Sequence, residues 1–183
     1  ASSYECESNW HLFEDKCYNV VFSTGDFLTI AQRCLTMGAE MASVHSSQQF
    51  LFLRRITLNS DEASYGFWLG GKRNESYSTS FRWRDGSVWN YSDWADQHPT
   101  DPRKALHYDY VYMNSRMYVA YASSALHQLC QKQAKSQQRI AVELKFNETL
   151  ANNDVSKLES RIGKIEKIFY VISKALKNDT RFL

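Results

Sequence analysis

Four cysteines, all within the first 130 residues, constrain this chain more than any other feature. They are Cys6, Cys17, Cys34 and Cys130. An even number of cysteines in an aromatic-rich domain predicts two disulfides, and three pairings are compatible with the sequence. Their spacing differs from the paired Cys-x-x-Cys clusters of structural zinc sites. Disulfides are typical of proteins that leave the cytosol, so we expect an oxidising compartment.

The composition changes sharply along the chain. Residues 1–130 carry 11 basic and 14 acidic side chains, a net of −3, whereas residues 131–183 carry 11 basic and 6 acidic ones, a net of +5. All five tryptophans and both prolines lie in the first part, and the second part has a single glycine, Gly163. We predict a compact domain over residues 4–133 and a helical extension over residues 134–183. The overall charge of +2 is too small to indicate a nucleic-acid partner.

Four Asn-x-Ser/Thr sequons support a secretory route. They begin at Asn74, Asn90, Asn147 and Asn178. We expect Ala1-Ser2-Ser3 to be a mature start left after removal of a leader. The longest apolar run, Ile168 to Ile172, is far too short to span a membrane. These features predict a secreted glycoprotein or an extracellular ectodomain.

Hydrophobic periodicity predicts two helices near the front of the chain. Their apolar positions recur at three and four residues: Phe27, Ile30, Ala31, Cys34 and Leu35, then Phe50, Leu51, Leu53 and Ile56. Ser23 or Thr24 is expected to cap the first helix, and Gly38 to end it. Ser46 or Ser47 is expected to cap the second helix.

Short strands are expected behind these helices. The predicted strands are Met41–Val44, Phe67–Leu69 before a turn at Gly70-Gly71, Phe81–Trp83 before an Asp85-Gly86 turn, Tyr108–Met113, Met117–Tyr121 and Leu126–Cys130. A long loop over residues 87–107 separates two of them. Two helices and short antiparallel strands, joined by disulfides, make the predicted fold class α+β.

The order of these landmarks resembles the C-type lectin-like domains over residues 6–132, about two-thirds of the chain. The resemblance is carried by Cys6-x10-Cys17, Cys34 on the first helix, the passage Met37–Val44, Phe67-Trp-Leu-Gly-Gly71, Trp83, Asp85-Gly86, the loop tryptophans Trp89 and Trp94, and Cys130-Gln-Lys132. It implies an extracellular binding domain in which Cys6 pairs with Cys17 and Cys34 with Cys130.

The departures from this family fall on its calcium-dependent sugar site. The family's Glu-Pro-Asn or Gln-Pro-Asp element corresponds to His98-Pro99-Thr100, and its Trp-Asn-Asp element to about Tyr118-Val119-Ala120. Neither segment offers the carboxylate and amide oxygens that Ca²⁺ prefers. The family's long-loop disulfide is also missing, with Tyr110 and roughly Ala122 at its expected positions. We predict no cofactor and no bound calcium. We also expect packing among five tyrosines to hold the loop: Tyr108, Tyr110, Tyr112, Tyr118 and Tyr121.

The candidate ligand-binding residues lie in the long loop. They are Trp89, Tyr91, Trp94, His98 and Thr100. Large aromatic side chains are favoured at interfaces, but core packing explains Trp89 and Trp94 equally well. A glycan on Asn90 would obstruct the face beside Tyr91. The loop carboxylates Asp96, Asp101 and Asp109 are expected to face water and not to bind calcium. His98 and His107 are expected to face water or to form hydrogen bonds, and not to bind zinc. No nucleophile lies in a recognisable setting, so we predict a non-enzyme.

A heptad repeat marks the C-terminal segment. Its apolar residues alternate in spacings of three and four: Val155, Leu158, Ile162, Ile165, Phe169, Ile172 and Leu176. Arg161 at position g and Glu166 at position e would pair across a parallel coil, and Ile168 and Val171 widen the apolar stripe. Asp154 is expected near the helix start. Residues 134–150 are expected to be helical, although the alternation from Ile140 to Phe146 also suits a strand.

Three functions are compatible with these features. The favoured one is a calcium-independent module that recognises a protein or complex glycan on a cell or matrix surface, made multivalent by its C-terminal helix. The second is a structural subunit whose helix pairs with another chain in a heteromeric complex. The third is a sugar-binding lectin with an unconventional calcium site. A helix folded onto its own domain, and a basic helix lying on a membrane surface, are the alternatives to association.

Overall fold

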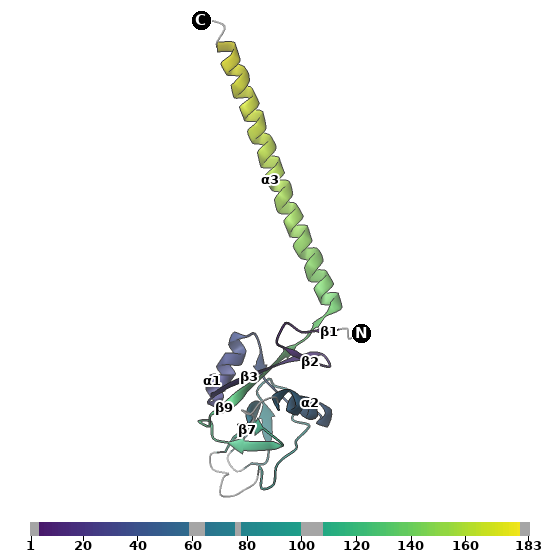
Figure 1. Ribbon diagram of the computed structural model, residues 1–183, viewed down its shortest axis with the longest axis vertical. Helices are drawn as coiled ribbons and strands as arrows, with labels where there is room; N and C mark the ends of the chain where they lie inside the picture. Colours follow the sequence, from purple (N-terminus) through teal and green to yellow (C-terminus); the bar gives the residue numbers. More distant parts are fainter. Residues whose placement is uncertain (1–3, 59–64, 76–77, 100–107, 180–183) are drawn as a thin grey trace. The chain divides into compact units, whose positions relative to one another are not determined.

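The computed structural model describes residues 4–58, 65–75, 78–99 and 108–179 (Figure 1). The chain divides after Ser136 into a domain and a separate helical unit. The domain elements are β1 (Tyr4–Glu5), β2 (His11–Phe13), β3 (Lys16–Gly25), α1 (Phe27–Thr36), β4 (Glu40–Met41), α2 (Ser47–Thr57), β5 (Phe67–Arg73), β6 (Phe81–Trp83), β7 (Tyr110–Met113), β8 (Met117–Ala120), β9 (Leu126–Gln133) and β10 (Lys135–Ser136). The helical unit is α3 (Gln137–Asp179).

The strands of the described residues form one large mixed sheet and one small pair. The large sheet has the order β2-β3-β9-β5-β7-β8, with β4 added to β9 and β6 added to β5. Its pairings are antiparallel except where β5 meets β9, at Phe67 and His127. The small pair joins β1 to β10. Within the domain, Figure 1 shows α1 and α2 on either side of the β3–β9 region, and β7 at the end away from β1. The α+β prediction is confirmed.

Helix α1 begins at a different cap from the one expected. Ser23 and Thr24 belong to the end of β3, and Asp26 is the N-cap, with its carboxylate accepting from the Thr29 N–H at 2.7 Å. Strand β3 extends to Gly25, beyond Ser23 and Thr24. Asp26 is therefore the first residue after the strand whose side chain can cap the helix. Gly38 ends the helix as predicted. Its positive φ of 64° accompanies a Schellman pattern of backbone bonds into the last turn.

Strand β5 corrects the expected turn at Gly70-Gly71. The strand continues through both glycines to Arg73, and Gly71 pairs with Trp83 of β6. A Cβ on Gly71 would lie 2.8 Å from the Val111 Cβ, closer than side chains approach one another. The glycines therefore permit close packing inside a strand. The expected strand Met41–Val44 is likewise shorter, because the Ser43 N–H bonds to the Gln131 side chain.

Two apolar clusters fill the domain. The larger lies between α2 and the sheet, and includes Phe50, Leu53, Leu69, Trp83 and Val111. The smaller is centred on α1: Phe27, Ile30, Cys34, Trp68 and Cys130. Both disulfide pairings implied by the resemblance are confirmed. Cys6 bonds Cys17, and Cys34 bonds Cys130 across a sequence separation of 96.

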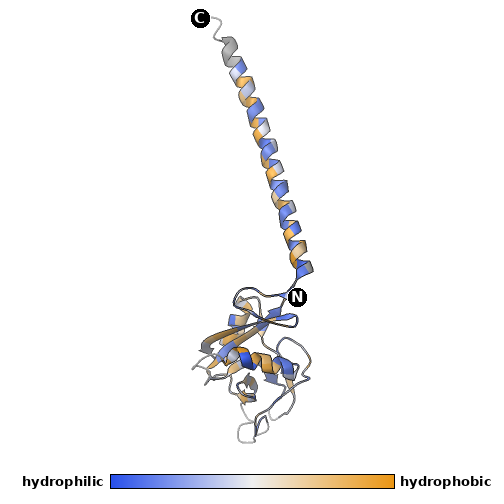
Figure 2. Cartoon of the chain, turned by 45° about the vertical axis from the view of Figure 1, so that its right-hand side comes forward, coloured by the Kyte–Doolittle hydropathy of each residue, from blue (hydrophilic) through white to orange (hydrophobic). Residues whose placement is uncertain are grey.

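Helix α3 confirms the helical prediction for the C-terminal segment. It starts at Gln137, after Lys135 and Ser136 have paired with β1. The alternation from Ile140 to Phe146 does not form a strand. Asp154 lies inside the continuous helix and does not start one, because no breaker separates the two halves. Figure 2 shows hydrophobic residues interspersed with hydrophilic ones along the coloured part of α3. Among the described helices, none is long and apolar enough to cross a membrane.

Candidate functional site

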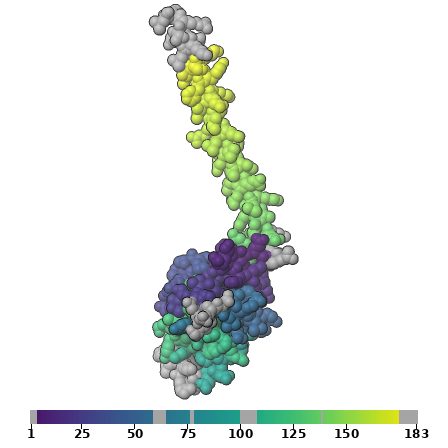
Figure 3. Space-filling model, in the orientation of Figure 1, coloured from purple at the N-terminus to yellow at the C-terminus, as the bar shows by residue number. Residues whose placement is uncertain are grey.

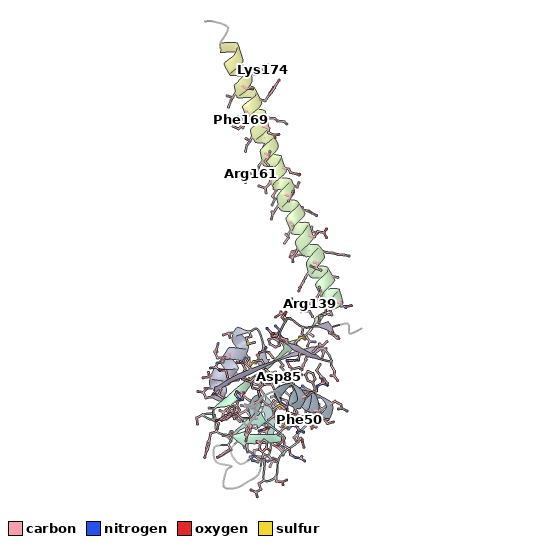
Figure 4. All side chains as sticks on the ribbon, viewed as in Figure 1. Phe50, Asp85, Arg139, Arg161, Phe169 and Lys174 are labelled. Carbon is pink, nitrogen blue, oxygen red and sulfur yellow. A yellow bond between two sulfur atoms is a disulfide. The ribbon has the colours of Figure 1, made fainter. Side chains whose placement is uncertain are left out.

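A buried polar network ties the front of the domain to its last strand. Ser43 donates to Asp85 Oδ2 at 2.6 Å, and the Gln131 amide donates to the same oxygen at 2.7 Å. Gln131 Oε1 in turn accepts from the Ser43 N–H at 3.0 Å. Burial raises the pKa of Asp85, but hydrogen bonds from Ser43 and Ser87 outweigh it, so the pKa is lowered overall. Asp85, labelled in Figure 4, is partly buried. The carboxylate is thus held ionised as a structural acceptor.

His45 and Gln49 extend this network toward the sequon at Asn90. The Gln49 amide donates to Tyr18 Oη and to the Ser43 carbonyl, both at 2.7 Å. His45 places Nε2 3.1 Å from Ser43 Oγ and Nδ1 2.8 Å from Asn90 Oδ1. Ser43, His45 and Asp85 are the residue types of a hydrolytic triad. However, the Ser43 side chain is buried and donates to the carboxylate, so the trio lacks an accessible nucleophile.

The loop tryptophans pack on one another beneath the long loop. Trp89 stacks on Trp83 with ring centroids 4.2 Å apart and on Trp94 at 6.0 Å, while Phe81 contacts both loop rings. Trp89, Tyr91 and Trp94 are half-buried against the larger core cluster. For Trp89 and Trp94, this packing is one of the two explanations that the sequence left open.

His98 also supports the loop. Its Nδ1 accepts from the Val119 N–H at 3.1 Å, and its ring meets Tyr118 edge-on at 5.2 Å. The backbone of the same loop pairs with the start of β8, because the Met117 N–H donates to the Asp93 carbonyl at 2.7 Å and the Ala95 N–H donates to the Met117 carbonyl. The segment that corresponds to the family's first calcium element is therefore hydrogen-bonded to β8 through a ring nitrogen of His98. Thr100, Asp101 and His107 lie outside the described residues.

Arg73 binds the long loop at Pro99 and the chain just after the loop at Tyr108. Its side chain is only 1% exposed, and one guanidinium nitrogen donates to the carbonyls of Pro99 and Tyr108 at 3.0 and 3.1 Å. Arg73 also donates to the Ser78 carbonyl and pairs with Asp109 at 3.3 Å. Pro99 and Tyr108 flank residues 100–107, so one cation fixes both anchor points of that segment. Sequence reasoning missed Arg73, since nothing in its local pattern distinguishes it from a surface arginine on β5.

Tyrosines on β7 and β8 form a second aromatic group, which we call the tyrosine face. It comprises Tyr108, Tyr110, Tyr112, Tyr118 and Tyr121. The antiparallel register sets Tyr112 opposite Tyr118, and their rings stack 5.0 Å apart. Tyr108 and Tyr121 approach to 4.1 Å. The predicted packing among these residues is confirmed for both pairs. Alternation in the strands sends Val111 and Val119 to the core and leaves the tyrosine rings partly accessible.

The position of the absent long-loop disulfide is filled by packing. Tyr110 lies on Phe27 with centroids 4.4 Å apart, and the Lys72 ammonium lies 5.3 Å from its ring. The Ala122 carbonyl accepts from the Phe27 N–H at 2.9 Å. Both positions are therefore joined to α1 and not to each other. In the space-filling view, this teal and green part of the domain lies away from the purple N-terminal strands (Figure 3).

The tyrosine face has the chemistry of a recognition surface. Burial first, and then the neighbouring hydroxyls of Tyr118 and Tyr108, raise the pKa of Tyr112. A hydrogen bond with Tyr108 raises the pKa of Tyr121, whose side chain is 43% exposed. These phenols therefore stay neutral at physiological pH. They present rigid rings with hydroxyl donors and acceptors, a combination that is frequent in binding surfaces.

The sequons lie at exposed positions where the structure describes them. Asn74, Asn90 and Asn147 are exposed, and the side chain of Asn178 lies outside the described residues. Asn74 donates to Ser80 at 2.6 Å, while Asn90 is bonded through Oδ1 to His45. Over residues 4–58, 65–75, 78–99 and 108–179, no group of three or more His, Cys, Asp or Glu side chains is placed to hold a metal ion.

No protein-family model matches the chain. Among curated proteins, Ladderlectin of Oncorhynchus mykiss is 28% identical over 97 residues, which are 53% of this chain and 50% of that protein. The low affinity immunoglobulin epsilon Fc receptor of Homo sapiens is 32% identical over 95 residues, 52% of this chain and 28% of the receptor. The chain thus spans half or less of the length of these relatives.

Solved structures match most of the domain. A Ca²⁺-dependent type II antifreeze protein in its Ca²⁺-free form is 26% identical, with a TM-score of 0.62, over 70% of this chain and all of that one. The cow C-type carbohydrate-recognition domain of CD23 is 24% identical, with a TM-score of 0.61, over 72% of this chain and 98% of that one. Residues 4–136 have the C-type lectin-like fold. The neighbours also include a calcium-independent type II antifreeze protein, so this fold alone does not decide calcium dependence.

The C-type lectin-like assignment bears on two predictions. Domains of this kind are typically non-enzymatic binding domains, which agrees with the non-enzyme prediction and with the buried state of Ser43. Disulfide-bonded domains of this kind are also typically extracellular, as the sequons suggested.

Proposed function

We propose that the lectin-like domain recognises a protein or complex glycan on a cell or matrix surface without calcium, and that α3 makes it multivalent. The observation that carries the proposal is the tyrosine face, which lies where the family resemblance places part of the calcium site. Tyr118 and its neighbours occupy the second calcium element, and His98 of the first element is bonded to the Val119 backbone. Imidazole and phenol groups are poor calcium ligands.

The tyrosine face suits recognition in three respects. Its rings are held by stacking, so little conformational freedom is lost when a ligand binds. Its hydroxyls provide directional hydrogen bonds to sugar or backbone groups. Arg73 and the tryptophan stack fix the loop beside it, which pre-organises the surface before binding. The last strand of the domain, β10, pairs with β1, and Figure 1 shows β1 at the end of the domain away from β7.

Calcium independence is tested by thermal unfolding. We compare the full chain in EDTA with the full chain in about 5 mM CaCl₂, a concentration above the 10⁻⁴–10⁻³ M dissociation constants of extracellular calcium modules. A site filled at that concentration would raise the melting temperature, because a ligand bound only to the native state stabilises it. We expect no shift. A reproducible increase with CaCl₂ would favour the unconventional calcium lectin instead.

The tyrosine face is tested by binding to a panel of immobilised complex N-glycans and extracellular-matrix proteins in EDTA. We expect Tyr118→Ala to lower binding by about tenfold or more, as truncation of an interface anchor does. Tyr170→Ala is the matched control, because Tyr170 is an exposed tyrosine on α3, outside the lectin-like domain. Equal binding by both variants would contradict the assignment of the face. Loss of all binding in EDTA with recovery in CaCl₂ would contradict calcium-independent recognition.

A further inference from the structure

The heptad positions of α3 are uncovered along their whole described length. Six of them have side chains that the structure describes, and these are exposed by between 49% for Ile172 and 67% for Phe169. An isolated amphipathic helix is marginal in water, because most helical stability comes from packing of the apolar face. Such a seam is stable only when other apolar groups cover it. Figure 4 shows Phe169 projecting from the helix, as well as Arg161 and Lys174.

We infer that Val155–Leu176 forms a parallel three-stranded coiled coil with two further copies of this chain. This inference deepens the proposed multivalence by naming the partner, the number of strands and their orientation. The spacing of three and four residues is maintained through three heptads, with a at Val155, Ile162, Phe169 and Leu176 and d at Leu158, Ile165 and Ile172. Ile168 at g and Val171 at c widen the apolar stripe beyond a strict a/d seam, and a third strand would cover part of this extra surface.

The identity of the d residues sets the number of strands. Isoleucine occupies d at Ile165 and Ile172, and it also occupies a at Ile162. β-Branched residues at d disfavour two-stranded parallel coils, and isoleucine at both positions favours three or four strands. Only the first heptad, with Val155 at a and Leu158 at d, has the two-stranded preference. Ile168 at g, which is 58% exposed, adds apolar area at the flank of the seam.

Charges at the flanking positions e and g set the orientation of the helices and identify the partners as further copies of this chain. In a parallel coil, g of one helix faces e of the next heptad on its neighbour, so Arg161 faces Glu166 of another copy. In an antiparallel arrangement e faces e, and both Glu159 and Glu166 occupy e, which brings like charges together. The earlier parallel pair, Asp154 with Glu159, is of like charge, which places the weak end of the coil at its start.

The rest of α3 defines where the coil begins. Counting heptads back from Val155 places Glu148 at a, so the apolar seam is interrupted there. Phe146 and Leu150 are exposed but fall on other faces of the helix. The sequon residue Asn147 precedes the seam, and Asn178 falls at position c, which faces away from it. A glycan at Asn178 is therefore compatible with the coil.

The test is the solution mass of the full chain by sedimentation equilibrium over a range of concentrations. We expect three times the 21.3 kDa polypeptide mass, plus any glycan, for the wild type. Ile165→Asp, at d, is expected to sediment as a single chain. Tyr170→Asp is the matched control: it introduces the same charge at an exposed b position, away from the seam, and is expected to keep three chains. All five tryptophans lie in the domain, so their fluorescence shows whether the domain of each variant is folded.

Charge reversal tests the orientation. Glu166→Arg is expected to weaken association by about tenfold, from three exposed ion pairs of a few tenths of a kcal/mol each and the repulsion that replaces them. Arg161→Glu together with Glu166→Arg is expected to restore it. A wild-type monomer would overturn the inference, as would a stable dimer, or an equal loss in the control and seam variants. A trimer that fails to bind the panel in EDTA would leave the inference intact and contradict the proposed function alone.

Discussion

The domain and α3 use the same apolar residue types in opposite ways. Trp68 and Leu53 are completely buried by their own chain, whereas Ile165 on α3 is 52% exposed. In the domain, two disulfides and a buried polar network join segments that are distant in sequence. In α3, hydrogen bonds are local and the apolar seam is left for another chain. The comparison teaches that one region carries its stabilising contacts within itself, whereas we propose that the other depends on association.

The largest predicted loss of stability comes from creating a cavity in the domain. Trp68→Ala removes a completely buried indole and its hydrogen bond to the Gly25 carbonyl, so we expect a loss of about 3–5 kcal/mol in the free energy of unfolding. Urea denaturation followed by far-UV circular dichroism measures it. The comparison predicts that the mass of the assembly changes little while the domain remains folded.

Leu28→Ala is the control for this cavity. Leu28 lies on α1 with 67% of its side chain exposed, so its truncation is expected to cost less than about 0.5 kcal/mol. Similar losses for the two variants would mean that the domain does not depend on the buried cluster around Trp68.

The next largest loss of stability is expected when Arg73, which bonds to Pro99 and Tyr108, is replaced. Arg73→Met leaves the Asp109 carboxylate and the carbonyls of Pro99 and Tyr108 without their shared donor. Breaking a fully buried pair costs about 3–5 kcal/mol, and the partial exposure of Asp109 reduces our expectation to about 2–3 kcal/mol. Urea denaturation gives the value, and limited proteolysis reports on the loop. If cleavage within residues 100–107 is unchanged at equal fraction folded, Arg73 does not restrain that segment.

Replacing glycine by alanine is expected to lower stability in the domain and to raise it in α3. Gly71→Ala places a methyl group against Val111 and Trp89, so we expect a loss of about 1–3 kcal/mol. Gly163→Ala meets no atom within 4 Å, and it is expected to strengthen α3 by about 0.5–1 kcal/mol, because alanine is the better helix former. Thermal melts of the domain and helicity at low concentration measure the two effects. Destabilisation by both would contradict the open environment of Gly163.

The smallest predicted effect is a pH dependence of the stability of the domain. The lowered pKa of Asp85 means that its ionised form contributes stability above the ordinary aspartate pKa of about 3.9. That contribution is lost as the pH falls through the lower value of the folded state. The stability difference between wild type and Asp85→Asn should therefore narrow below about pH 4. A difference that stays constant from pH 7 to the acid limit of folding would contradict an ionised Asp85.

Local signals in the sequence predicted much of the fold, and long-range contacts account for the misses. The heptad period and the lack of breakers predicted α3, and Gly38 correctly marked the end of α1. Asp26 was missed as a cap because Ser23 and Thr24 are equally good candidates until the length of β3 is known. The Gly70-Gly71 pair has the composition of a turn, and only the approach of Val111 reveals a strand.

The candidate site was predicted less completely. The tyrosine packing followed from the alternation in Tyr110–Met113 and the absent cysteines. Arg73 and Gln131 were missed, because their partners lie 26 to 88 residues away and leave no local pattern. The roles of Trp89 and Trp94 stayed open in the sequence, since a stacking support and a ligand platform require the same residue type.

The most direct test of the two-region account is amide hydrogen exchange of the full chain, measured by mass spectrometry over a dilution series. We predict that protection in the domain, especially around Trp68 and β9, is independent of protein concentration. Protection over Val155–Leu176 should fall on dilution, as the copies separate. Concentration-independent protection of that segment in a chain that stays monomeric would contradict the account, because α3 would then be stabilised within its own chain.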